Sequence, residues 1–162
     1  AVAMYAQDYD EVLPIKWYGG TNDAWDAPFL WMDLIFPYVK NEQVFTCPSG
    51  SGDAGIWNDL KSLHVTCSYG WNCGVADACK LSRIVYPARA IISGDKWPGT
   101  WEGRLCPCSP DSNIYCHGHA PDIHNDGANY LYFDSHVKWQ RPNSVGFGAD
   151  HPTALPHWVP WD

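Results

Sequence analysis

The stretch from residue 106 to residue 124 is dense in side chains that bind transition metals. It contains, in order, Cys106, Cys108, Cys116, His117, His119, Asp122 and His124. Thiolate and imidazole ligands suit zinc or copper, so one interpretation is a transition-metal site. The Cys-x-Cys spacing does not match the cysteine pairs of structural zinc sites. The alternative is a disulfide from Cys106 or Cys108 to Cys116, with the histidines on a polar loop.

Hard oxygen ligands follow on the C-terminal side of this stretch. Asp122, Asn125, Asp126 and Asp134 together could bind calcium, which takes carboxylate and amide oxygens. No EF-hand loop is present. The alternative interpretation is that these are ordinary turn residues with solvated carboxylates. Calcium is therefore the candidate cofactor, beside the alternative that none is bound.

Catalytic signatures are absent from the sequence. It contains no Gly-x-Ser-x-Gly, no His-Glu-x-x-His and no P-loop. We therefore predict that the protein is not an enzyme. Its 10 tryptophans could line a sugar-binding face, although most tryptophans pack in cores and interfaces.

Seven cysteines, together with 14 glycines and 13 prolines, indicate an oxidising compartment. The candidates for disulfide bonds are Cys47, Cys67, Cys73, Cys79, Cys106, Cys108 and Cys116. A bond from Cys47 to Cys67 would close a loop of about twenty residues, worth roughly 3 kcal/mol in the chain-entropy model. Cys73 and Cys79 could pair locally. Because seven is odd, one cysteine is free, bound or paired between molecules. The alternative is buried thiols that pack as small apolar side chains.

A hairpin near the C-terminal end must position the candidate ligands between His124 and Asp134. Residues 128–133 and 136–139 predict two strands, joined by the two-residue turn Asp134-Ser135. In this register one face carries Tyr130, Tyr132, Val137 and Trp139. Ser135 stands where a tight turn with positive φ favours glycine, so strain on the order of 1 kcal/mol is expected there.

Two helices are expected before the sheet. Residues 1–13 carry apolar side chains at helical spacing and precede Pro14. The acidic end of this helix opposes the helix dipole, so packing or a longer helix must stabilise it. A second helix is expected over residues 28–36, with Pro37 ending it.

Composition excludes two classes of partner. The net charge of −8 argues against nucleic acid and against an anionic membrane surface. The sequence has no apolar run of about 20 residues that could cross a bilayer.

Its 162 residues, without repeat or linker, indicate one domain over 1–162. Prolines make 140–162 an extended tail, which contains Trp158 and Trp161.

Four segments resemble a large bacterial family of secreted proteins with type IV prepilin-like N-termini. His124 and Asp134 match the spacing of that family's His-x9-Asp-Gly signature, and Ser135 replaces its glycine. The matching segments are residues 4–14, 34–49, 68–72 and 124–139. The resemblance implies a pilin-like or pseudopilin-like α+β fold. In it an N-terminal helix, the end of a longer one, packs on a small antiparallel sheet with long disulfide-bonded loops.

The resemblance also implies a function. It points to a non-catalytic structural subunit that is secreted and self-assembles into an extracellular pilus-like or pseudopilus-like filament. The subunit would meet a membrane only through a segment preceding Ala1. We expect Met4, Tyr5, Trp158 and Trp161 to contact neighbouring copies. A secreted carbohydrate-binding module and a secreted metal-binding protein are the alternatives.

Overall fold

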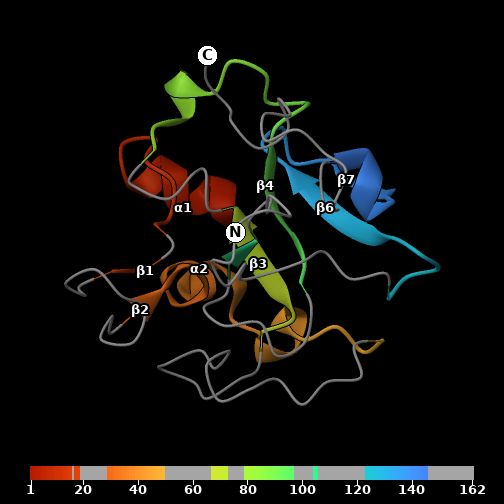
Figure 1. Ribbon diagram of the computed structural model, residues 1–162. Coiled ribbons are helices and arrows are strands. Elements are labelled where there is room, and N and C mark those ends of the chain that lie inside the picture. Colours follow the sequence, from red (N-terminus) through yellow and green to blue (C-terminus); the bar gives the residue numbers. More distant parts are fainter. Residues whose placement is uncertain are drawn as a thin grey trace, which may run out of the picture.

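The computed structural model describes residues 1–15, 17–18, 29–49, 67–72, 79–96, 104–105 and 123–145 of the chain (Figure 1). The helices are α1 (Val2–Asp8), α2 (Trp31–Val39) and the 3-10 turns η1 (Glu42–Phe45), η3 (Leu81–Arg83) and η5 (Pro142–Val145). The strands are β1 (Trp17–Tyr18), β2 (Phe29–Leu30), β3 (Tyr69–Asn72), β4 (Ile91–Asp95), β5 (Arg104–Leu105), β6 (Ala128–Tyr132) and β7 (Val137–Gln140). The fold is α+β, as predicted, with a short N-terminal helix and a small, mainly antiparallel sheet. No described helix is long and apolar enough to cross a membrane.

The main sheet has the strand order β5-β3-β4-β6-β7. Four of these strands pair antiparallel, and only β5 runs parallel to its neighbour β3. All five residues of β4 are buried. Because β4 is central, both of its faces are buried, which suits the apolar or small residues Ile-Ile-Ser-Gly. The last residue of the strand, Asp95, is a buried carboxylate.

Helices cover one face of this sheet, and Figure 1 shows β3 and β4 between them and the β6–β7 hairpin. Trp31 of α2 stacks on Trp71 of β3, with ring centroids 5.1 Å apart. Tyr5 of α1 and Ile92 of β4 belong to the same buried cluster. The opposite face has its own buried cluster, formed by Ile91, Leu105, Ala128, Tyr130, Tyr132 and Val145.

The first helix is shorter than predicted. It ends at Asp8 instead of residue 13, because Asp10 and Glu11 adopt positive φ angles of 53° and 60°. The backbone N–H of Glu11 then bonds to the carbonyl of Ala6 at 2.8 Å, which closes the helix end. Tyr38 of α2 donates a hydrogen bond to Asp8 at 2.8 Å, and this bond raises the pKa of Tyr38 to about 12.

The second helix also differs from its predicted limits. It spans Trp31–Val39 and contains Pro37 instead of ending before it. The side chain of Asp33 accepts a hydrogen bond from the backbone N–H of Leu30 at 2.9 Å, which satisfies a free donor at the helix start. The helix ends at Lys40, whose φ is 55°.

The hairpin forms where predicted, but its register is shifted by one residue. Leu131, not Tyr132, pairs with Val137, and Asn129, not Tyr130, pairs with Trp139. A shift of one residue moves a strand's side chains to the opposite face. Val137 and Trp139 therefore share a face with Asn129 and Leu131, and the predicted common face of four side chains is wrong.

The hydrogen bonds of the turn match this register. The backbone N–H of Ser135 bonds to the carbonyl of Tyr132 at 2.9 Å, and Tyr132 bonds to the carbonyl of His136 at 2.9 Å. The loop thus contains three residues, in which a turn is followed by one residue of positive φ. Ser135 is that residue, with φ 74°, so the expected positive φ is confirmed.

We expect Ser135→Gly to raise the free energy of unfolding by about 1 kcal/mol, because glycine adopts positive φ without a Cβ penalty. Urea denaturation followed by circular dichroism would measure the change. Ser135→Ala is the matched control and should give no gain, since alanine keeps the Cβ. An equal gain in both variants would place the effect in the serine hydroxyl instead of the backbone.

Candidate functional site

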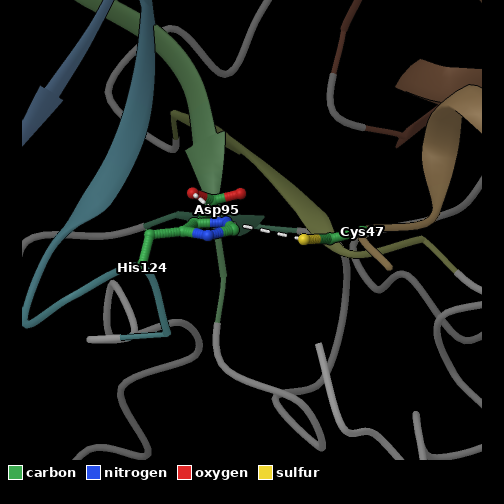
Figure 2. Close-up of side chains that lie close together, drawn as sticks. All are labelled: Cys47, Asp95 and His124. Atoms are coloured by element: carbon green, nitrogen blue, oxygen red, sulfur yellow. Dashed lines mark hydrogen bonds and ion pairs between the residues drawn. The ribbon is translucent and has the colours of Figure 1, made fainter. Parts of the chain in front are cut away.

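Three side chains from separate segments converge beyond the C-terminal end of β4. They are Cys47, after η1; Asp95, the last residue of β4; and His124, in the turn before β6 (Figure 2). The Sγ atom of Cys47 lies 3.5 Å from Nε2 of His124, and Oδ2 of Asp95 lies 3.4 Å from the same nitrogen. The three atoms all lie within 4.8 Å of one another.

Cys47 is held in place by its backbone. Its N–H donates to the hydroxyl of Ser68 at 2.9 Å, and the N–H of Ser68 donates to the carbonyl of Phe45 at 2.8 Å. These two bonds join the segment after η1 to the segment before β3. The thiol of Cys47 is buried and directed toward the His124 ring (Figure 2).

Asp95 is 1% exposed, which is unusual for a carboxylate. Its Oδ2 accepts hydrogen bonds from the backbone N–H of Asn129 at 2.6 Å and from the Asn129 side chain at 3.2 Å. Its Oδ1 is buried and has no hydrogen-bond partner among the described residues. Burial raises the pKa of Asp95, although the Asn129 bonds and the nearby His124 partly oppose this.

His124 is positioned by the hairpin. Its N–H donates to the carbonyl of Gly127 at 3.0 Å, and its carbonyl accepts from Nε1 of Trp139 at 2.6 Å. Asn125 and Asp126 between them adopt φ angles of 55° and 60°. The Trp139 ring lies directly over Gly127, where a Cβ atom would overlap it. The side chain of His124 stays 24% exposed.

The three groups line a cavity of about 710 Å³ on the helix-covered face of the sheet. Apolar side chains form much of its wall: Val2, Trp31, Ile35, Val39, Phe45, Trp71 and Leu131. Val137 of β7 lies at the same cavity. A thiol, a carboxyl and an imidazole thus stand together in a largely apolar setting, where charge interactions are stronger than in water.

The geometry differs from that of a cysteine nucleophile with a histidine base. Such a site uses both ring nitrogens, one for the nucleophile and one for the orienting carboxylate. Here Nε2 of His124 faces both Cys47 and Asp95. One nitrogen holds at most one proton, so it cannot accept from the thiol and donate to the carboxylate at once. Three electron-pair donor atoms, one each of sulfur, nitrogen and oxygen, that lie within 4.8 Å of one another suit a cation instead.

The disulfide predictions for the described cysteines are wrong. Cys47, Cys67 and Cys79 are free thiols. The Sγ of Cys67 donates to the carbonyl of Tyr69 at 3.4 Å, whereas the Sγ of Cys47 faces His124, so the two do not pair. Burial raises the pKa of Cys67 to about 11, which makes its thiol unreactive at neutral pH. A Cys73–Cys79 bond is excluded as well, because Cys79 is free.

Several other predicted metal ligands and disulfide candidates lie outside the described residues. These are Cys73, Cys106, Cys108, Cys116, His117, His119 and Asp122. The calcium set, which includes Asp122, therefore stays a prediction. Of its described members, Asp134 accepts hydrogen bonds from the backbone of His136 at 3.2 Å and pairs with the His136 ring at 2.5 Å.

Two of the four predicted assembly residues, Met4 and Tyr5, lie in the described part of the chain. Met4 is exposed and Tyr5 is buried, with its ring stacked on Tyr9 at 4.3 Å. Trp158 and Trp161 lie outside the described residues.

Two of the three convergent residues were predicted in other sets, and the third was not predicted. Cys47 was expected in a disulfide and His124 among the transition-metal ligands of residues 106–124, whereas Asp95 was not a candidate. One signal was available, since Asp95 ends a buried apolar strand, a place where an aspartate needs a partner. Compared with protein-family models, curated proteins and solved structures, the chain matches none of them.

Proposed function

We propose that the protein is a non-catalytic, secreted, pilin-like subunit that assembles with copies of itself into an extracellular filament. The ordered resemblance of four segments supports this proposal, and so does the combination of an N-terminal helix with a small antiparallel sheet. Both features are general, so the proposal depends mainly on the surface of the subunit.

The observation that carries the proposal is a pair of unlike apolar surfaces. Val137 and Trp139 lie on one face of β7 and are 64% and 44% exposed. β7 is the last strand of the described sheet. On α1, Met4 is 51% exposed. Contacts between two different patches of identical subunits do not close on themselves and propagate as helical filaments. We place the β7 surface of one copy against the α1 surface of the next.

A charge in either surface should prevent assembly. Met4→Asp and Val137→Asp each bury a carboxylate in the proposed contact, and a cost of about 1.4 kcal/mol already weakens association tenfold. Electron microscopy and sedimentation of the full-length protein would compare the filament fraction. Val85→Asp is the control, because Val85 is similarly exposed (51%) and lies on neither surface.

The expected result is loss of filaments in the first two variants and wild-type filaments in the control. A wild-type protein that stays monomeric at high concentration would contradict the proposal. So would filaments that tolerate both charges.

A further inference from the structure

We propose that Cys47, Asp95 and His124 form a binding site for a divalent transition-metal ion of the zinc class, whose fourth coordination position opens to the cavity. The proposal does not rest on filament assembly, although Val137 and Trp139 of the β7 surface border the same site. The site also differs from the sites predicted in the sequence, since two of its ligands, Cys47 and Asp95, lie far from residues 106–126.

Two of the three distances between the ligand atoms are those around a tetrahedral ion. Bonds of about 2.3 Å to sulfur and about 2.0–2.1 Å to nitrogen or oxygen, at tetrahedral angles, separate sulfur from nitrogen by about 3.5 Å and nitrogen from oxygen by about 3.4 Å. The structure has Cys47 Sγ at 3.5 Å and Asp95 Oδ2 at 3.4 Å from His124 Nε2. The third pair, Cys47 and Asp95, lies within 4.8 Å, so closing it to the about 3.5 Å of a tetrahedral ion needs a shift of no more than about 1.3 Å.

An ion also resolves the electrostatics of the cluster. Asp95 is 1% exposed, and its Oδ1 has no partner in the described part of the chain. A buried polar atom without a partner costs about 1–3 kcal/mol, and more when it is charged. A cation beside this carboxylate offsets that cost. It also removes the conflict at Nε2, which would then direct a lone pair at the metal.

The ligand set indicates which ion. One thiolate, one imidazole and one carboxylate are borderline in softness, and zinc accepts all three. Three protein ligands leave one position for water or a small molecule, as in catalytic zinc sites. The cavity of about 710 Å³ adjoins the cluster and is also lined by Trp31 and Trp71, so a ligand in that position would enter a partly aromatic cavity.

Outer contacts fix each ligand, as metal sites require. Asn129 donates twice to Asp95, Ser68 accepts from the backbone of Cys47, and Trp139 donates to the carbonyl of His124. The ligands come from three segments that are joined mainly by the sheet. Metal binding should therefore stabilise the folded protein against heat.

Titration with Co²⁺ tests the site, because cobalt replaces zinc and a cobalt–thiolate bond gives a near-ultraviolet absorption band. We expect one equivalent of Co²⁺ to produce the band and Zn²⁺ to displace it. Cys47→Ser should abolish the band, and Asp95→Asn or His124→Gln should weaken binding by more than the about 10–100-fold that losing an outer contact costs. Asn129→Ser should fall within that 10–100-fold range.

Matched controls separate this site from the other cysteines and histidines. Cys79→Ser, His136→Gln and a variant with serine at positions 106, 108 and 116 should all keep the band and the affinity. Circular dichroism checks folding of each variant. His124→Gln keeps the test informative if Cys47→Ser does not fold, since His124 is partly exposed. Absence of stoichiometric binding would overturn the proposal, as would a band that survives Cys47→Ser or disappears in the triple-serine variant.

Discussion

Replacing Trp71 with alanine should lower the free energy of unfolding by about 3–5 kcal/mol, the usual cost of removing a buried tryptophan. Trp71 is fully buried, and its ring stacks on Trp31 at 5.1 Å. This stack joins α2 to β3. The adjoining cavity leaves little material that could collapse into the space, so the loss should fall in the upper part of this range.

Urea denaturation would measure this loss. Val85→Ala is the control, since Val85 is exposed and surface substitutions change stability by about 0.5 kcal/mol or less. A loss below 1 kcal/mol for Trp71→Ala would mean that α2 does not dock on β3 as described.

Replacing Gly94 with alanine should cost about 1–3 kcal/mol through overpacking. A Cβ atom at Gly94 would lie 2.8 Å from Cδ1 of Tyr130, 2.9 Å from the backbone oxygen of Asn129 and 3.2 Å from Cδ2 of Leu105. The Asn129 oxygen belongs to the neighbouring strand β6, so it cannot move without disturbing the pairing of β4 with β6.

This substitution should reach the candidate site as well. Asp95 follows Gly94 directly, and its Oδ2 bonds to Asn129 across the same pair of strands. We therefore expect Gly94→Ala to weaken Co²⁺ binding in addition to lowering the urea midpoint. Lys138→Ala, on the exposed strand β7, should change neither. Unchanged stability of Gly94→Ala would contradict the close approach of β4 to β6.

The parts of the fold that local signals specify were predictable. Aromatic and β-branched residues alternate through residues 128–139, and a hairpin forms there. The apolar pair Ile91-Ile92 likewise lies in a strand, Ile91–Asp95. Both helices exist, but their ends were misplaced. Pro37 is tolerated inside α2, and Asp10 and Glu11 turn the chain earlier than Pro14 would.

The hairpin register depended on one choice of turn. A two-residue turn and a three-residue loop with one positive φ both suit Asp134-Ser135, and they differ by one residue in register. Tertiary contacts select the second. In that register Trp139 pairs with Asn129, covers Gly127 and donates to the carbonyl of His124. Nothing local in the sequence distinguishes the two.

The candidate site could not be predicted from spacing. Cys47, Asp95 and His124 are separated by 48 and 29 positions along the chain, and only the sheet brings them together. Motif reasoning favours ligands that are close in sequence, which led to residues 106–124. The one local signal was the buried position of an aspartate at the end of an apolar strand.

X-ray absorption at the zinc edge, on protein loaded with one equivalent of Zn²⁺, tests the convergence of these three residues most directly. We predict one sulfur ligand at about 2.3 Å and nitrogen or oxygen ligands at about 2.0–2.2 Å in a four-coordinate ion, with the sulfur lost in Cys47→Ser. An ion with no sulfur ligand, or with two or more, would show that Cys47, Asp95 and His124 do not form the metal site.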